Sequence, residues 1–305
     1  MAMETSEPQG NPLIILNPAA NRGDMAHHRS VVRNRSAQEQ ADYRETVKQG
    51  DARAWAMQAA AEGRPIIVVG GDGTVNEVVN GMLSSGRRVP LGIVPAGSGN
   101  DFACYALKLP RDPVAALERA FNGRLVDVDA GTINGTYFVA TFSIGLDADI
   151  AATTNWMRKI PLMHGGQLYY TSALWQLLFG YQHCPWLKLC LDGQYDQEVE
   201  RRYVLMATTN GPTYGAGFRI NPAADYSDGL LDICTIDYAP LLRSLKLLPV
   251  VKKGEHAGLP EVTFYRAKVI HIECKQTTNI QIDGEVIRAA NLDAKVLPAA
   301  LQVRV

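Results

Sequence analysis

The sequence has little net charge and no long apolar run, and each shortage narrows the function classes. Lys and Arg number 30 and Asp and Glu number 31, so the formal net charge is −1. This balance gives no global attraction to nucleic acid or to an anionic membrane. The longest mostly apolar run, 168–181, is too short to span a bilayer and contains Thr171, Ser172 and Gln176. We therefore expect no nucleic-acid partner, and we expect any membrane contact to be peripheral.

Cysteines are also few. The chain has 5, an odd number, and no two of them have C-x-x-C spacing. Disulfides are therefore not expected, and a reducing compartment is the simplest interpretation. The first residues, MAMETSEPQG, have neither a charged n-region nor an apolar h-region, so no signal peptide is predicted. A cytoplasmic location is expected.

What is present is a globular composition. Hydrophobic residues make up 47% and charged residues 20% of 305 residues, enough for a sizeable core in one large or two smaller domains. In the first third, apolar strands are predicted at 13–16, 65–69 and 91–95. Helices are predicted at 51–63 and 112–123. Strands that alternate with helices indicate a parallel sheet with helices on both faces.

The predicted helix starts have recognisable signals. Asp51 and Asp112 have the N-cap residue type, and Pro113 follows Asp112 at the first helical position. Thr74 and Glu77 have the spacing of a capping box, which predicts that a helix begins at the glycine loop before Thr74.

After about residue 125, short strand-like segments separated by turns replace this pattern, with a helical interruption near 165–180. We expect an α/β domain at 11–128 and a β-rich, mostly antiparallel domain at 129–294.

Two glycine loops are candidate phosphate sites. The segment 70–74 (GGDGT) follows a strand and opens a helix, so its backbone N–H groups can bind an anion. Asp72 would repel a bare phosphate, unless Mg²⁺ or a sugar hydroxyl lies between them. The second loop, 97–101 (GSGND), follows the next strand and would meet the first at the same sheet edge. Neither loop matches the dinucleotide or Walker A pattern. The alternative is that both are ordinary strand-to-helix turns.

Two acidic turns are candidate reaction and metal sites. Asp283 and Glu285 flank Gly284 in a predicted hairpin turn, and their carboxylates could reach one point. A carboxylate within reach of an alcohol can accept its proton during phosphoryl transfer. Asp225 and Asp228 have the hard oxygens and close spacing of a metal turn. Solvated acids at the tips of turns are the alternative in both cases. No role is assigned to histidine or cysteine.

Five ordered motifs together resemble the diacylglycerol-kinase catalytic-domain family, and the soluble bacterial lipid kinase branch is the most similar. Sphingosine and ceramide kinases are its relatives. Two of the five motifs consist of two segments each. In chain order the motifs are NPAANRG (17–23), GGDGTVNEVVNG (70–81) with PAGSGNDFA (95–103), VDAGTING (128–135) with FSIGLDADI (142–150), YGAGFRINPAADYSDGLLDI (214–233) and IQIDGE (280–285). Ala216 stands where the family usually has glycine, and Ser98 where it commonly has threonine.

The resemblance implies specific ligands for ATP and Mg²⁺. The residues it implies for ATP are Asn17, Pro18, Ala19, Ala20, Asn21, Thr46, Gly71, Asp72, Gly73, Thr74, Val75, Asn76, Glu77 and Ser98. It implies that Asp225, Asp228 and the carbonyl of Leu230 hold Mg²⁺. Glu285 would be the catalytic base with Asp283 beside it, and Asp72 and Asp129 would join a carboxylate–water network toward the metal.

The implied fold has an N-terminal three-layer α/β domain, like those of NAD kinase and phosphofructokinase, and a C-terminal β-sandwich-like domain. The resemblance implies that the domain at 11–128 binds ATP and is rejoined by the C-terminal segment 295–305. It implies that the domain at 129–294 holds the lipid substrate and the metal. The implied activity is transfer of the γ-phosphate of ATP to a hydroxyl of a lipid such as diacylglycerol, phosphatidylglycerol or a sphingoid lipid. An NAD kinase-like phosphotransferase and a non-catalytic lipid- or nucleotide-binding regulator are the alternatives. A homodimer is compatible with the sequence, which does not define the oligomeric state.

The lipid is expected at the membrane surface. The segment 156–163 combines apolar and basic residues as an interfacial element does, and 168–181 could add an acyl-chain surface. Helical apolar residues more often belong to a core, which is the alternative for both segments.

Overall fold

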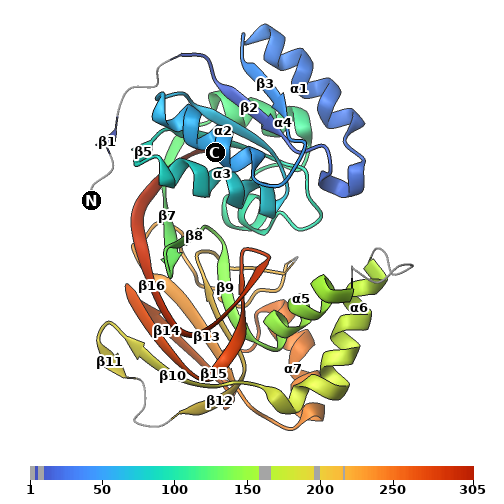
Figure 1. Cartoon of the computed structure of the whole chain (residues 1–305), viewed down its shortest axis with the longest axis vertical. Coiled ribbons are helices and arrows are strands. Elements are labelled where there is room, and N and C mark those ends of the chain that lie inside the picture. The colour runs from blue at the N-terminus through green and yellow to red at the C-terminus, as the bar shows by residue number, and fades with distance from the viewer. Residues whose placement is uncertain (1–3, 6–9, 158–165, 196–199, 216) are drawn as a thin grey trace.

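The computed structural model describes residues 4–5, 10–157, 166–195, 200–215 and 217–305. Two domains lie one above the other and share a 14-stranded sheet (Figure 1). Of the segment 156–163, which was expected at the membrane, only residues 156 and 157 are described, and residues 158–163 and Ala216 lie outside the described residues.

The N-terminal domain is a three-layer α/β structure. Its parallel strands have the order β3-β2-β4-β6. Their bounds are Leu13–Leu16 for β2, Asp42–Glu45 for β3, Ile66–Gly70 for β4 and Pro90–Pro95 for β6. Helices α2 (Asp51–Ala61) and α3 (Asp72–Ser84) pack on one face, and α1 (Ala26–Gln38) and α4 (Pro113–Asn122) on the other. Successive strand side chains point to opposite faces, so Ile15 and Ile14 belong to different core clusters.

The helix start expected at Asp112 is confirmed. Asp112 accepts a hydrogen bond from the backbone N–H of Ala115 at 2.9 Å, and Pro113 begins α4. The Asp51 expectation is wrong, since Asp51 accepts hydrogen bonds from the N–H groups of Val47 and Lys48 upstream of it. Gly50, with φ of +90°, stands at the N-cap of α2 instead.

The expected capping box is also wrong. Helix α3 begins two residues earlier, at Asp72, with Gly71 at its N-cap and no side-chain cap. Thr74 Oγ1 instead accepts from Asn17 Nδ2 at 2.9 Å, and Glu77 Oε2 accepts from Gly50 N at 3.0 Å. Both side chains bind neighbouring loops because those loops lie within reach in the folded domain, which local spacing does not encode. The helix expected after the second glycine loop is a π-helical segment, η2 (Asp101–Ala106).

The C-terminal domain is built from antiparallel strands, with three α-helices gathered on one side of them among the described residues (Figure 1). The strand bounds are Leu125–Ile133 for β7, Thr136–Phe138 for β8, Thr141–Gly145 for β9, Trp186–Leu191 for β10, Gln194–Tyr195 for β11, Arg201–Thr209 for β12, Leu231–Asp237 for β13, Val262–Ala267 for β14, Val269–Ile282 for β15 and Glu285–Arg304 for β16. The helices are α5 (Leu146–Met157), α6 (Gly166–Trp175) and α7 (Leu241–Lys253). Short helical turns η3 (Gln176–Gly180) and η4 (Tyr181–His183) follow α6.

Strand β16 joins the two domains. It pairs with β15 in the C-terminal domain, with β7 along the junction, and in parallel with β6 through Gln302 and Val303. Short strands β1 (Glu4–Thr5) and β5 (Arg87–Arg88) form a separate two-stranded sheet, and η1 (Ala20–Gly23) follows β2.

The predicted fold class, α/β followed by a β-rich domain, is confirmed, although helices α5 and α7 were not anticipated. The cysteines have no disulfide partners in the structure. Within the described residues, no helix combines the length and the apolar character needed to cross a membrane.

Candidate functional site

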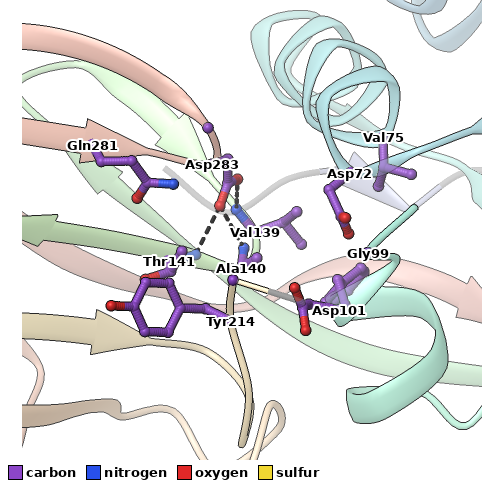
Figure 2. A pocket seen from close by; sticks show the side chains of 13 residues that line it. Asp72, Val75, Gly99, Asp101, Val139, Ala140, Thr141, Tyr214, Gln281 and Asp283 are labelled. Carbon is purple, nitrogen blue, oxygen red and sulfur yellow. Dashed lines mark hydrogen bonds between the residues drawn. The ribbon is translucent and has the colours of Figure 1, made fainter. Parts of the chain in front are cut away.

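An acidic cavity of about 220 Å³ lies between the two domains. Asp72 and Asp101 line it from the N-terminal domain, and Asp283 lines it from the β15–β16 turn (Figure 2). Thr141 and Gln281 complete the wall on the side of the C-terminal domain. Three carboxylates at one cavity favour a guest that brings hydrogen-bond donors or a cation.

Asp283 is buried and held by four hydrogen bonds. Its carboxylate accepts from the backbone N–H groups of Val139, Ala140 and Thr141 at 2.8, 3.1 and 2.7 Å. Asn76 Nδ2 donates a fourth at 2.7 Å. The turn geometry makes this possible, since Asp283 has φ of +44° and Gly284 has φ of +94°, as in a two-residue hairpin turn with positive φ at both positions. Burial raises the pKa of Asp283, and the hydrogen bonds oppose that shift.

Asp72 opens helix α3 beside the second glycine loop. The backbone N–H of Asn100 donates to Asp72 Oδ2 at 2.8 Å. Burial raises the pKa of Asp72, and the charges of Asp101 and Asp283 raise it further. Asp101 accepts from the N–H of Gly217 at 2.8 Å, which links this loop to the C-terminal domain.

Asp283 lines the acidic cavity, whereas Glu285 does not. It is exposed, and its Oε1 accepts from Gln49 Nε2 at 2.9 Å. The expectation that both carboxylates serve one point is not met, because they have separate hydrogen-bond partners. Glu285 instead contacts the loop that precedes α2 in the N-terminal domain.

A second polar cavity, of about 250 Å³, lies at the carboxyl ends of β2 and β3. Six of the residues expected at ATP line it: Asn17, Pro18, Ala19, Thr46, Thr74 and Glu77. Lys48 and Gln49 also line it. We call this the nucleotide cavity, after the expectation that it holds ATP.

The other residues expected at ATP lie elsewhere. Asp72 and Val75 line the acidic cavity, and Asn76 binds Asp283. Ala20 and Asn21 belong to η1 beyond the nucleotide cavity, and Ser98 is exposed in the second glycine loop.

The two glycine loops are in direct contact at Gly71 and Gly97. A Cβ atom on Gly97 would lie 2.5 Å from the Cα of Gly71. Gly73 differs, since a Cβ there would meet no atom within 4 Å. Glycine at 97 therefore serves loop packing, and glycine at 73 leaves the helix start open for a ligand.

An apolar cavity of about 150 Å³ adjoins the acidic cavity, and the two share Tyr214 and Gly215. Residues of α5, β12, β13 and α7 line it. The apolar lining residues are Leu146, Ile150, Val204, Leu205, Phe218, Ile220, Ile236, Leu247, Leu248 and Val251.

Asp147 is the carboxylate of the apolar cavity. Its Oδ2 accepts from Ser143 Oγ at 2.5 Å and from Tyr214 Oη at 3.2 Å, whereas Oδ1 is buried without a partner. Burial raises its pKa, and the hydrogen bonds from Ser143 and Tyr214 oppose that shift. Because Tyr214 lines both cavities, it links Asp147 to the acidic cavity.

The turn at 225–230, where Mg²⁺ was expected, does not line the acidic cavity, and we call it the metal turn. Asp225 Oδ1 accepts from the N–H and hydroxyl of Ser227, and Asp228 pairs with Arg266. Arg266 Nε also lies 3.2 Å from Asp232 Oδ1, while Asp232 Oδ2 is buried without a partner. Burial raises the pKa of Asp232 to about 6; a hydrogen bond from the backbone of Asp225 opposes this shift, and the negative charge of Asp225 adds to it. Arg266 thus pairs with two carboxylates of this region, Asp228 and Asp232, and leaves the Oδ2 oxygen of Asp232 without a hydrogen-bond partner.

Asp129 contacts this turn and not Asp72. Its Oδ2 accepts from the N–H of Gly229 at 2.7 Å, and its Oδ1 accepts from the N–H of Ala299 at 2.7 Å. Asp129 thus fixes the metal turn against β16. Among the described residues, no three His, Cys, Asp or Glu side chains are grouped as metal ligands, so a cation would also need backbone oxygens.

Sequence reasoning missed several residues of these cavities. Asp101 was visible in the second glycine loop, next to an asparagine with φ of +57° at its helix start. Lys48 and Gln49 lie beside the expected Thr46 but carry no motif. Tyr214 begins a recognised motif, yet its position between two cavities depends on tertiary packing.

Family models match nearly the whole chain. Residues 11–133 match the diacylglycerol kinase catalytic domain, and residues 140–305 match the YegS C-terminal NAD kinase beta sandwich-like domain. A diacylglycerol kinase of Mycobacterium tuberculosis is 35% identical over 259 residues, which cover 83% of this chain and 81% of the relative. A diacylglycerol kinase of Bacillus subtilis is 30% identical over 280 residues, covering 89% and 88%.

A solved structure has the same architecture. A putative diacylglycerol kinase from Bacillus anthracis superposes with a TM-score of 0.76 at 25% identity, covering 96% of this chain and 97% of that one. These matches identify the chain as a lipid kinase. The chain belongs to the diacylglycerol kinase family.

Proposed function

We propose that the protein transfers the γ-phosphate of ATP to a hydroxyl group of a lipid such as diacylglycerol, phosphatidylglycerol or a sphingoid lipid. The observation that carries this proposal is the contact between the acidic cavity and the apolar cavity at Tyr214 and Gly215. A lipid hydroxyl in the acidic cavity would have its chain in the apolar one. A second nucleotide such as NAD would gain nothing from the apolar lining.

ATP would occupy the nucleotide cavity, with its phosphates toward the start of α3. The free N–H groups and positive dipole end of this helix favour an anion there. Gly73 leaves that approach open, as noted above. Lys48 supplies a positive charge at the cavity wall.

Glu285 would accept the proton of the attacking hydroxyl, and Asp283 would position the hairpin that carries it. Glu285 already contacts Gln49, whose loop lines the nucleotide cavity. The proposed base would lie next to Gly284, at the edge of the acidic cavity and beside the loop of the nucleotide cavity, where donor and acceptor would meet.

Mg²⁺ would be held by Asp225, Asp228 and the carbonyl of Leu230, with Asp129 fixing the turn. A bound Mg²⁺ would supply positive charge to this acidic turn. Asp72 would extend a water-mediated network from the acidic cavity toward it. The unpartnered Asp232 Oδ2 supports a cation here.

The acceptor would come from a membrane surface. Leu174, Trp175, Leu178 and Phe179, at the end of α6 and in η3, have exposed side chains and fall within the expected segment 168–181. Exposed aromatic and aliphatic side chains of this density favour an interfacial contact. Replacing Leu178 by Asp should weaken vesicle binding if this segment contributes.

The test is transfer of labelled γ-phosphate from ATP, with Mg²⁺, to a panel of lipids in mixed micelles, with NAD as a control acceptor. A labelled lipid is the expected product and identifies the acceptor. Label on NAD alone would contradict the proposal. Binding of ATP without any labelled product from the full panel would favour a non-catalytic regulator.

A further inference from the structure

Helix α7 has two apolar faces, and the described fold covers only one of them. Leu247 and Val251 are buried in the cluster that surrounds the apolar cavity, and Ser244 is buried beside them. On another face, Leu242, Leu245 and Leu248 are 75%, 37% and 45% exposed. A spacing of three residues places them in one row along the helix. We call this row the leucine ridge.

The leucine ridge lies at the apolar cavity. Leu248 belongs both to the ridge and to the cavity lining. Ser244 Oγ lies 2.5 Å from Tyr181 Oη, which ties α7 to η4 directly after the exposed residues of η3. The ridge and η3 are therefore attached to the same buried cluster, and the cavity lies against that cluster.

The charges of α7 select an anionic partner. The helix contains Arg243, Lys246, Lys252 and Lys253 and no acidic residue. Arg243 is neutralised by Glu261, at 2.6 and 3.0 Å. Lys246, Lys252 and Lys253 are exposed. Leucines flanked by lysines on one surface helix are typical of an element that lies in an anionic bilayer interface.

We propose that the leucine ridge inserts into the acyl layer of an anionic bilayer while Lys246, Lys252 and Lys253 contact its headgroups. This inference rests on the proposed lipid kinase function, because it places the bilayer where a lipid chain would enter the apolar cavity. An acceptor could then move from the bilayer into the cavity without exposing its chain to water.

Vesicle binding by the full chain tests the ridge directly. The double variant Leu242→Asp/Leu245→Asp leaves Leu248 and the cavity lining unchanged. With vesicles of phosphatidylcholine and phosphatidylglycerol in equal parts, we expect its partition coefficient to fall roughly tenfold or more below wild type. Val114→Asp is the matched control, since Val114 is 57% exposed on α4 of the other domain. Its binding should equal wild type.

Wild-type partitioning of the double variant, or a wild-type chain that binds no vesicles, would overturn the proposal. A third outcome would also overturn it: the wild-type protein is a dimer, and the double variant is a monomer that binds vesicles as well as wild type. The leucine ridge would then contact a second copy of the chain. The melting temperature of each variant confirms that it is folded.

Insertion depth gives an independent measurement. Leu245→Trp replaces one exposed apolar side chain by another and places a fluorophore on the ridge. Quenching of the added fluorescence by brominated acyl chains is expected. Its absence in protein that is bound to vesicles would overturn insertion.

Activity separates this inference from the proposed function. The double variant should phosphorylate a dispersed short-chain diacylglycerol at the wild-type rate and lose most activity toward the same headgroup in vesicles. Equal loss on both substrates would contradict a membrane role. Loss of vesicle binding in a protein that phosphorylates no lipid would support the ridge and refute the kinase reaction.

Discussion

Asn76 Nδ2 donates to Asp283 Oδ2 at 2.7 Å, and this hydrogen bond joins the helix after the first glycine loop to the hairpin of the other domain. The carboxylate also satisfies three backbone N–H groups of 139–141. Asp283→Ala would leave these buried donors without a partner. We expect the free energy of unfolding to fall by about 2–4 kcal/mol, measured by urea denaturation.

Asp192→Ala is the matched control for this loss. Asp192 also precedes a glycine in a hairpin turn, has φ of +50°, and accepts from the N–H groups of Lys268 and Val269. It is exposed, so water can replace it and the cost should stay below about 1 kcal/mol. Equal losses in the free energy of unfolding for Asp283→Ala and Asp192→Ala would contradict the expectation that burial makes the loss of the Asp283 carboxylate more costly.

Glu285→Gln tests the proposed base. The side chain keeps its size and can still bind Gln49, but it cannot accept a proton. We expect kcat to fall by about 10²–10⁴-fold with the melting temperature unchanged. Gln49→Ala removes the hydrogen-bond partner and leaves the carboxylate, so it should cost less than about tenfold. A Glu285→Gln enzyme that retains most of its kcat would exclude this residue as the base.

Two glycines of the loops should respond in opposite ways. Gly97→Ala would force a Cβ within 2.5 Å of Gly71 and 2.9 Å of Asn100 Oδ1, lowering stability by about 1–3 kcal/mol. Gly73→Ala has open space in a helix, so it should raise stability by about 0.5–1 kcal/mol. If phosphate approaches this backbone, the KM for ATP should rise in Gly73→Ala. Thermal denaturation and steady-state kinetics measure both, and an unchanged KM would count against phosphate contact at Gly73.

Asp147 predicts a pH dependence of stability. Burial raises the folded-state pKa of this carboxyl above its unfolded value, so folding favours the protonated form. Its contribution is therefore present at low pH and is lost as the pH rises through the folded-state pKa. Asp147→Asn should remove this dependence and gain stability relative to wild type toward neutral pH. Urea denaturation between about pH 4 and pH 8 tests this, and parallel curves for the two proteins would contradict it.

Local sequence was sufficient for much of the fold. The strand LIIL at 13–16 has the predicted bounds, and Asp112 with Pro113 starts α4 as predicted. These signals depend on neighbouring residues alone. The expected cap at Thr74 is wrong because its hydroxyl accepts from Asn17, which only the packed loops bring near. The expected cap at Asp51 is wrong because its carboxylate accepts from the N–H groups of Val47 and Lys48 in the preceding turn. Helix α7 was missed although its apolar and basic pattern is visible in the sequence.

The site depended more on tertiary structure. The turn at Asp283 and Glu285 was predicted, but its two carboxylates contact different elements, which spacing cannot reveal. Six expected nucleotide residues line one cavity, because parallel strands end at the same sheet edge. Tyr214 could not be placed from the sequence, since it links two cavities built from distant segments.

Strand β16 has a consequence for synthesis on the ribosome. Gln302 and Val303, among the last residues of the chain, pair with β6 of the N-terminal domain. The N-terminal sheet therefore cannot acquire this partner until residues 302–303 have been synthesised and have left the exit tunnel. The N-terminal domain would emerge from the ribosome first, and the edge of β6 that pairs with β16 would stay unpaired until that strand has emerged. Removal of the final few residues should consequently impair the domain that is synthesised first.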